Sequence, residues 1–258
     1  TFLLGFKGQT ADFDDLPPNG PEGFVIGVVG ENDKGQDDYY VELQIDANGG
    51  QVWKETIAPD VELRLDAATM PHQLVREANG DFSFQEADYQ DRKVGDDDTN
   101  PFPSFVGYPL ADIFFHRNRL GLLADENVIF SEAGKFDSFN FFKRTTLTLL
   151  DSDVIDVAVS NNKVSLLRHA VPFNESLLLF SDLTQFRLDA TDLLTPETVS
   201  IDVTTQFEAS LRAKPIGAGR YVFFSTRRGK WSGVREYFVD LQSEVDDAAD
   251  ITAHVPSY

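Results

Sequence analysis

Acidic side chains give this chain of 258 residues its main capacity for chemistry, since it contains 43 Asp and Glu residues. Two carboxylates facing each other across a cleft can hydrolyse a glycoside, and clustered carboxylates can bind Ca²⁺. Several acids adjoin in sequence, at Asp37-Asp38, Asp96-Asp97-Asp98, Asp151 with Asp153, and Asp246-Asp247. With so many acids, neighbours occur by chance, and neither 46–48 nor 96–98 has the EF-hand spacing. We favour solvated loops, and keep Asp96, Asp97 and Asp98 as a candidate acidic channel or loop.

Other reactive residue types are scarce or badly spaced. The four histidines, at positions 72, 116, 169 and 254, include no pair at i, i+4, so no zinc-protease motif is present. The absence of cysteine excludes disulfide scaffolds, thiolate metal sites and cysteine nucleophiles. Gly217-Ala218-Gly219 lacks the third glycine of a dinucleotide loop and is typical of a hairpin turn. We therefore predict no catalytic residue, no metal site and no cofactor, and a protein that is not an enzyme.

The net charge of the chain indicates which classes of binding partner are disfavoured. The formal net charge is −21, and residues 1–100 carry 22 acids against 7 bases, whereas residues 101–258 carry 21 against 15. Binding to phosphates requires an excess of Lys and Arg, so gripping nucleic acid or an anionic membrane is disfavoured. No apolar run reaches the roughly 18 residues of a membrane span, so no membrane anchor is expected. Hydrophobic residues at 41% indicate a folded chain.

The first hundred residues predict an acidic domain of antiparallel β-hairpins. Val41, Leu43 and Ile45 alternate with polar residues, and the turn-forming stretch 46–50 leads to a return strand at 52–57. A second hairpin pairs 72–76 with the region of Phe82 and Phe84 around Asn79-Gly80. The acidic, proline-containing stretch 95–103 then predicts a boundary between a domain at 1–100 and one at 101–258.

Residues 101–258 contain a repeated pattern. Apolar runs end in Phe-Ser at 128–131, 177–181 and 221–225, each preceded by turn residues. Short strands with a period in the forties are typical of β-propeller blades, although hairpins of a β-sandwich are also compatible. The fold class predicted is therefore mainly β, with the hairpin domain followed by part of a β-propeller, about three blades. A closed propeller needs roughly four to eight blades, so we expect a fragment of a longer protein.

A basic and aromatic segment at 113–120 stands out against the acidic background. Its candidate contact residues are Phe114, Phe115, His116, Arg117 and Arg119. Arginine and aromatic residues are enriched at protein interfaces, which favours a subunit or inter-domain contact. A hairpin rim that offsets neighbouring acids explains the segment equally well.

Several longer strings carry a resemblance to a known family. They include Thr69-Met70-Pro71-His72-Gln73-Leu74-Val75-Arg76, residues 101–107 and 113–121, and later residues 126–131, 148–153, 171–173, 236–239 and 247–256. In these strings the chain resembles the tail tubular protein B family, the tail nozzle proteins of short-tailed phages. The matching strings run in the family's order from about residue 40 to residue 258.

The resemblance implies a structural virion protein without catalytic residues. It implies a hexameric ring in the full-length protein, a β-propeller, contacts with the adaptor (tail tubular protein A) and tail fibre proteins, and a phage-tail location after assembly in the host cytoplasm. DNA would pass through the ring without being bound, which an acidic channel favours. The alternative is a carbohydrate-active or carbohydrate-binding tail propeller, which would need an aromatic cleft and, for cleavage, opposed carboxylates.

Overall fold

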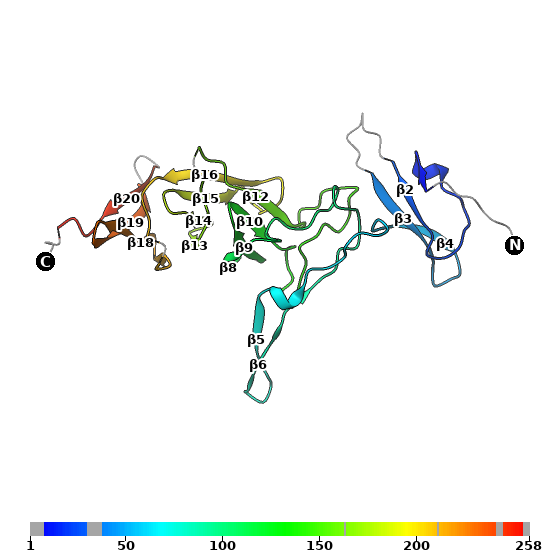
Figure 1. Cartoon of the computed structure of the whole chain (residues 1–258), viewed down its shortest axis with the longest axis horizontal. Helices are drawn as coiled ribbons and strands as arrows, with labels where there is room; N and C mark the ends of the chain where they lie inside the picture. Colours follow the sequence, from blue (N-terminus) through cyan, green and yellow to red (C-terminus); the bar gives the residue numbers. More distant parts are fainter. Residues whose placement is uncertain (1–7, 30–37, 163, 211, 241–244, 255–258) are drawn as a thin grey trace. The chain divides into compact units, whose positions relative to one another are not determined.

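The computed structural model of the chain describes residues 8–29, 38–162, 164–210, 212–240 and 245–254. These form two compact units. The first comprises Thr1–Phe102 with Asp137–Asp153, and the second comprises Pro103–Phe136 with Val154–Tyr258. The described residues are mainly strands joined by turns and short 3₁₀ segments, as labelled in Figure 1. The prediction of a mainly β chain is confirmed.

The first unit contains a four-stranded sheet in the order β1-β2-β3-β4. Its strands are β1 (Gln9–Thr10), β2 (Val25–Val28), β3 (Tyr39–Ile45) and β4 (Gln51–Thr56). The predicted hairpin is confirmed, since β3 and β4 pair antiparallel from Tyr40↔Thr56 to Ile45↔Gln51. Asp46 stabilises the turn because its Oδ1 accepts hydrogen bonds of 2.8 Å from the N–H groups of Asn48 and Gly50. Alternation on β3 buries Val41 and Leu43.

A second hairpin is formed by β5 (His72–Arg76) and β6 (Phe82–Glu86), which confirms the pairing predicted around Asn79-Gly80. Gly80 has φ +93, a conformation that favours glycine. The short 3₁₀ segments η1 (Phe13–Asp15) and η3 (Ala67–Thr69) begin at Asp12 and Asp66, whose side chains accept N–H hydrogen bonds. The first unit also contains a parallel pairing between β7 (Asp88–Tyr89) and β11 (Ser138–Phe139).

Glu55 attaches the returning segment 137–153 to the rest of the first unit. Its carboxylate accepts hydrogen bonds from Thr145 Oγ1 (2.6 Å) and from the N–H and Oγ1 of Thr146 (2.7 Å each). All three donors meet one partly buried carboxylate at the end of β4. Hydrogen bonds to an ionised acceptor are stronger than neutral ones, so this contact fixes the segment.

The second unit contains three four-stranded antiparallel sheets. The first has β8 (Leu110–His116), β9 (Arg119–Ala124), β10 (Asn127–Phe130) and β12 (Ile155–Ala158). The second has β13 (His169–Phe173), β14 (Ser176–Phe180), β15 (Gln185–Ala190) and β16 (Val199–Thr205). The third has β17 (Ile216–Ala218), β18 (Tyr221–Arg228), β19 (Trp231–Val239) and β20 (Asp246–Asp250). In the second and third sheets, neighbouring strands are consecutive in the chain, whereas in the first sheet β10 pairs with β12 and the intervening β11 belongs to the first unit.

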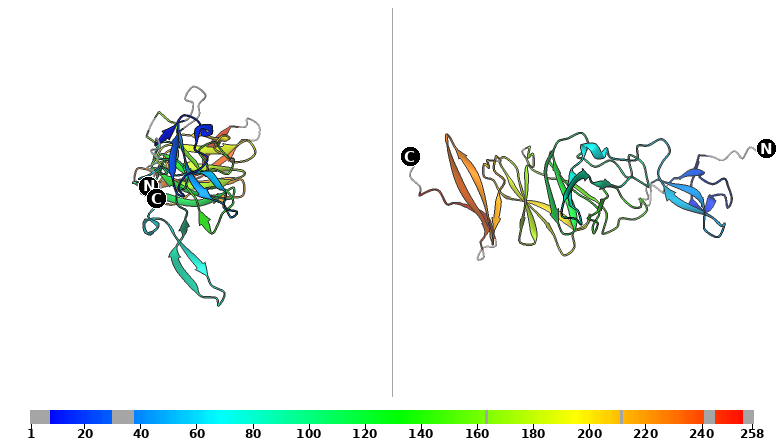
Figure 2. Two further views of the ribbon diagram at one scale, coloured as in Figure 1. Left: turned by 90° about the vertical axis from the view of Figure 1, so that its right-hand side faces the viewer. Right: turned by 90° about the horizontal axis from the view of Figure 1, so that it is seen from below.

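The three sheets pack one after another within this unit, as Figure 2 shows. One apolar cluster joins the first and second sheets through residues such as Phe114, Leu123, Leu179 and Phe186. A second cluster joins the second and third sheets through residues such as Phe180, Phe224 and Tyr237. None of the sheets formed by the described residues closes on itself, so the predicted propeller stays a prediction.

The Phe-Ser repeat falls on real strands but not on equivalent ones. Phe180 and Phe224 lie on β14 and β18, the second strands of their sheets, whereas Phe130 ends β10, the third strand of its sheet. All three rings are buried. The pattern therefore marks buried strands, and its first copy is offset by one strand from the other two.

Candidate functional site

The segment 113–120 forms the end of β8, a tight turn and the start of β9. Successive side chains on a strand point to opposite faces. Phe114 accordingly is buried, with its ring edge-on to Phe130 at 5.7 Å between centroids, whereas Ile113 and Phe115 are exposed. The ring of Phe115 lies 6.1 Å from that of Phe136. Of the two phenylalanines in the candidate contact, Phe115 therefore presents the more accessible ring.

The basic residues of this segment connect the first and second sheets of their unit. Arg117 is in the turn, with φ +45, and its guanidinium donates to the main-chain oxygens of Asp192 (2.9 Å) and Glu175 (3.0 Å). Arg119 is buried and donates to the main-chain oxygens of Ser131 (2.9 Å) and Leu194 (3.1 Å). Both arginines therefore contribute to packing within the unit, and their predicted role in a subunit or inter-domain contact stays a prediction.

His116 precedes these arginines at the end of β8 and is partly buried. Desolvation by burial lowers the pKa of its imidazole, and the positive charge of Arg117 lowers that pKa further. The imidazole is therefore neutral near pH 7. A neutral ring next to the phenylalanines suits a packing role.

The three consecutive acids at 96–98 have different environments. Burial alone would raise the pKa of Asp96, but hydrogen bonds donated by Thr99 and by the Asp98 N–H lower that pKa below its ordinary value. Asp97 is 2.9 Å from Arg92, with 72% of its side chain exposed, and Asp98 is exposed as well. Asp96 therefore stabilises the turn, and Asp97 and Asp98 present their carboxylates to solvent. The paired acid Asp37 lies outside the described residues.

A buried arginine that sequence reasoning missed organises the same region. Arg92 donates from Nε (3.1 Å) and Nη2 (2.5 Å) to the main-chain oxygen of Glu62, and from Nη1 to that of Asn100 (2.9 Å). Its guanidinium carbon is also 4.8 Å from the ring centroid of Phe102. Main-chain oxygens leave no signature in the sequence, so no residue pattern marks this position.

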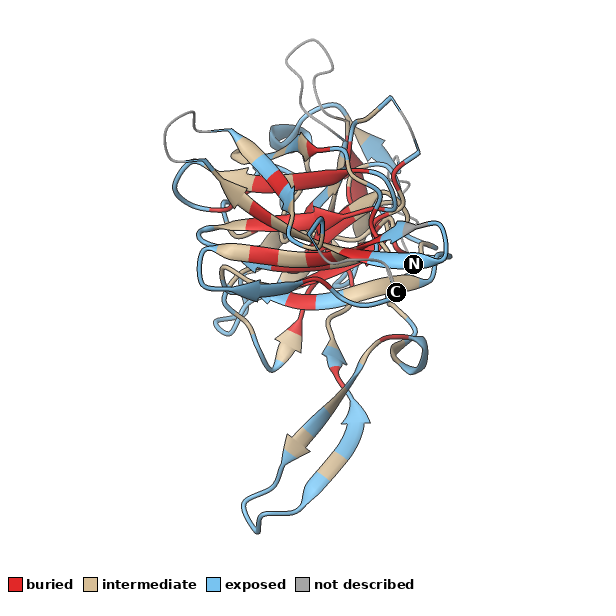
Figure 3. Cartoon of the chain, turned by 90° about the vertical axis from the view of Figure 1, so that its left-hand side faces the viewer, coloured by how far each residue is buried: buried red, intermediate tan, exposed pale blue. Residues whose placement is uncertain are grey.

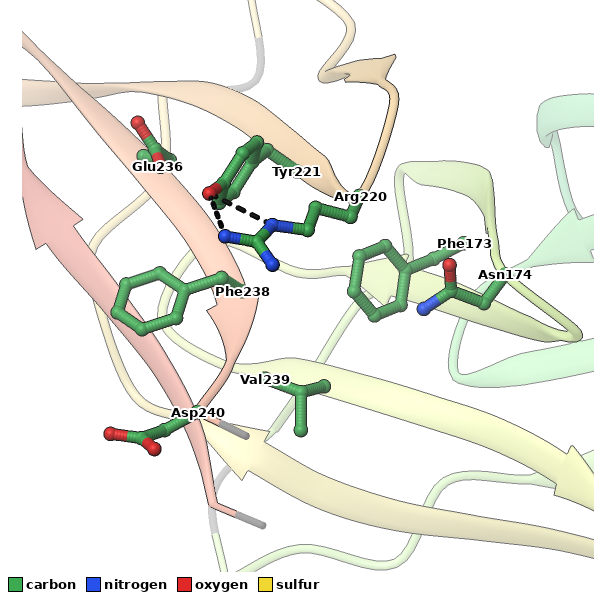
Figure 4. Close-up of a pocket in the computed structure, with 8 residues that line it drawn as sticks. All are labelled: Phe173, Asn174, Arg220, Tyr221, Glu236, Phe238, Val239 and Asp240. Carbon is green, nitrogen blue, oxygen red and sulfur yellow. Dashed lines mark hydrogen bonds between the residues drawn. The ribbon is translucent and has the colours of Figure 1, made fainter. Parts of the chain in front are cut away.

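A pocket in the second unit, next to β18 and β19, has a volume of about 520 Å³. It is lined by Phe173, Asn174, Arg220, Tyr221, Glu236, Phe238, Val239 and Asp240 (Figure 4). Arg220 donates to the hydroxyl of Tyr221 from Nε (2.9 Å) and Nη2 (2.7 Å). Glu236 and Asp240 lie on opposite sides of Phe238 in Figure 4, and their carboxylates do not face each other. The lining suits binding of a ring-shaped ligand better than hydrolysis.

The described ranges contain neither a candidate metal site nor a candidate membrane-spanning helix. No three His, Asp or Glu side chains there come close enough to hold a metal ion. Within the same ranges, no helix has the length and apolar character needed to span a bilayer.

Comparison with known proteins identifies the family. A family model described as "Bacteriophage nozzle protein" matches residues 1–258. The tail tubular protein gp12 of Escherichia phage T7 is 44% identical over 247 residues, which cover 95% of this chain and 30% of that protein. The chain thus spans under a third of the length of this curated relative. The resemblance noted from the sequence strings is confirmed.

A solved structure, that of a putative 6-phosphogluconolactonase from Bacteroides fragilis, is similar at a TM-score of 0.41 and 12% identity. That match covers 82% of this chain and 63% of the other, and a likeness this low carries no argument about fold or activity. The family assignment rests instead on the sequence match along the entire chain. This chain belongs to the bacteriophage nozzle protein family.

Proposed function

We propose that this chain forms part of the wall of a phage tail nozzle, the conduit through which the genome leaves the virion. The observation that carries the proposal is the family match over residues 1–258, together with 44% identity to a tail tubular protein. The packed antiparallel sheets of the second unit suit a wall because each sheet is buried against the next. The role is structural, and no catalytic residue is part of the proposal.

The second unit is proposed to contribute three blades of a β-propeller. Tyr221, Phe223 and Phe238 share the face of the third sheet that points away from its buried cluster, and Ile216 pairs with Phe223 on β17. Ile216 is exposed and the rings of Tyr221 and Phe223 are only partly buried. A further sheet packed on this face would bury these side chains and extend the series, as propeller blades do.

We propose that the exposed acidic residues prevent DNA from binding to the wall of the channel. Negative walls repel phosphates, so a genome slides past without the counterion release that drives binding. Asp97 and Asp98 expose carboxylates, and residues 1–100 hold 22 acids against 7 bases. We propose that this part of the chain borders the channel.

Assembly is proposed to be a hexameric ring that contacts the adaptor (tail tubular protein A) and tail fibre proteins in the virion. Subunits in a closed ring meet head to tail, so each copy uses two different surfaces. Within this scheme, the exposed part of segment 113–120 belongs to a subunit contact.

The test combines electron microscopy of the assembled protein with a measurement of how fast variant phages eject their genome. Full-length protein is examined for six-fold rings by electron microscopy, and phage carrying Asp97→Lys with Asp98→Lys is compared with phage carrying Glu197→Lys, an exposed acid at 101–258. We expect rings in all cases and slower ejection for the 97/98 variant. Absence of rings refutes the nozzle wall, whereas unchanged ejection with rings intact refutes only the acidic channel.

A carbohydrate-binding role is the second candidate, and the pocket beside β18 favours it. Tyr221 and Phe238 supply aromatic surfaces and Arg220 supplies hydrogen-bond donors, which is the combination that sugar sites use. Titration with host capsule or peptidoglycan fragments tests this role, and Tyr221→Ala should remove binding. Sugar release without loss of rings would favour an enzymatic tail protein instead.

A further inference from the structure

The β5–β6 hairpin carries an uncovered apolar face. Leu74 pairs with Phe84 across the two strands, and Phe82 lies two pairs further toward the tip, opposite Arg76. These three side chains share one face and are 65%, 73% and 62% exposed, respectively. The hairpin extends as a free-standing arm in Figure 1, and most of it is coloured as exposed in Figure 3.

The hairpin is tied to the first unit mainly at its base. His72 Nδ1 lies 2.9 Å from the main-chain oxygen of Met70, and the hydroxyl of Tyr89 donates to that of Pro71 at 2.7 Å. Toward the tip the hydrogen bonds stay within the arm, such as Ser83 Oγ to Glu77 at 2.5 Å. An isolated two-stranded hairpin is only marginally stable in water, and a cluster of exposed apolar side chains marks an interaction site.

The charges and the apolar face of the arm favour a protein partner over a lipid or a nucleic acid. At the tip, Glu77 and Asp81 outnumber the single exposed base Arg76, so anionic lipid headgroups or nucleic acid phosphates would be repelled. A protein surface with an apolar centre and basic residues at its edge would be complementary to both parts of the arm.

This chain has such a surface on its second unit. Ile113, Phe115 and Phe136 are 47%, 54% and 58% exposed. Arg117 follows on the same segment with its guanidinium bonded to main-chain oxygens, and Lys135, which is 41% exposed and lies 3.7 Å from the Glu132 carboxylate, adjoins Phe136. We call Ile113, Phe115 and Phe136 the β8 face. Its apolar centre and basic edge match the arm.

We infer that the β5–β6 arm of one copy docks on the β8 face of a neighbouring copy. The inference rests on the proposed ring, because a closed ring requires each copy to offer one surface and receive the other. A standard interface buries about 800 Å² per partner, more than three side chains supply, so the arm is one part of a larger contact. This inference adds to the proposed function the two surfaces through which neighbouring copies contact each other.

Disulfide trapping tests the contact. The described chain has no cysteine, so a protein with Leu74→Cys and a second with Phe115→Cys form a mixed disulfide only between copies. Val75→Cys with Phe115→Cys is the matched control, since Val75 is on the opposite face of the arm. The full-length protein without introduced cysteine reports any native crosslinking.

We expect about tenfold more crosslinked dimer for the 74/115 mixture than for the 75/115 mixture, because docking raises the local concentration of the paired thiols. Equal crosslinking in the two mixtures, with six-fold rings intact, overturns the inference and leaves the proposed function standing. A disulfide that forms only when both substitutions are in one chain shows docking within a copy and also overturns it. Absence of rings in the unsubstituted protein removes the proposed function itself.

A second variant separates docking from folding. Leu74→Ser with Phe84→Ser changes exposed side chains, so the circular dichroism spectrum should be unchanged. We expect rings to dissociate at protein concentrations about tenfold higher than for the unsubstituted protein. Rings of unchanged stability contradict the docking.

Discussion

Replacing Arg92 tests whether buried hydrogen bonds to the main chain hold the loops of the first unit. The side chain of Arg92 is fully buried and bonds the main-chain oxygens of Glu62 and Asn100, while Phe102 covers its guanidinium. Asp97 is the ion-pair partner, but its carboxylate is largely exposed. We predict that the hydrogen bonds to main-chain oxygens outweigh the ion pair.

The expected losses in the free energy of unfolding distinguish the main-chain hydrogen bonds of Arg92 from its ion pair with Asp97. Hydrogen bonds from a charged donor contribute about 1.5–3 kcal/mol each, and breaking a buried charged network costs about 3–5 kcal/mol. Arg92→Ala should therefore lower the free energy of unfolding of the first unit by about 4 kcal/mol. Arg92→Lys keeps the charge but loses the forked geometry, for a loss of about 2 kcal/mol. Asp97→Asn should cost only about 0.5 kcal/mol, because the Asp97 carboxylate is largely exposed to water, which weakens its attraction to Arg92.

Urea unfolding followed by tryptophan fluorescence measures these losses. The chain has two tryptophans, Trp53 in the first unit and Trp231 in the second, so a Trp231→Phe background reports the first unit alone. The Arg92 and Asp97 variants are compared in that background. Equal losses for Arg92→Ala and Asp97→Asn would refute the reasoning, because the ion pair would then dominate. A loss below about 1 kcal/mol for Arg92→Ala would refute it as well.

Three further predictions concern other contacts. Glu55→Gln should destabilise the first unit by about 1–3 kcal/mol and speed amide hydrogen exchange in residues 137–153, since the variant lacks the charged acceptor. Burial raises the pKa of Tyr89 to about 12 from its usual 10, so folding stability should fall between pH 10 and 12, where the unfolded chain loses the phenolic proton first. Tyr89→Phe should reduce that fall in urea midpoints measured at pH 9 and 11. Gly121→Ala should cost about 3 kcal/mol or more in thermal unfolding, because the added methyl would overlap the ring of Phe114.

Local sequence patterns predicted the hairpins because their cause is local. The alternation of Val41 and Leu43 with polar residues requires a strand with one buried face, and both side chains are buried on β3. Asn79-Gly80 indicated a tight turn because glycine adopts positive φ at low cost, and Gly80 does so. The return of residues 137–153 to the first unit has no such signal. It depends on contacts such as those of Glu55, distant in sequence and ordinary in composition.

For the candidate contact segment 113–120 as well, the sequence predicts some features, and others depend on packing with distant residues. Phe114 and Phe115 must face opposite sides of a strand, but only packing against Phe130 decides that Phe114 is the buried one. Arg119 is buried because the main-chain oxygens of Ser131 and Leu194 accept its hydrogen bonds, and oxygens of this kind are present at every residue. The sequence therefore located an unusual segment, and the structure distinguishes its exposed ring from its internal supports.

The resolved pKa shifts of the buried groups follow from burial and hydrogen bonding. General acid–base catalysis near pH 7 requires groups whose pKa values are moved toward neutrality. In the described part of the chain, burial raises the pKa of Tyr89 and Tyr237 away from 7, and the net effect at Asp96 lowers its pKa away from 7. Burial lowers the pKa of His116, which leaves its ring neutral at pH 7. Each of these four groups thus keeps one protonation state around neutral pH.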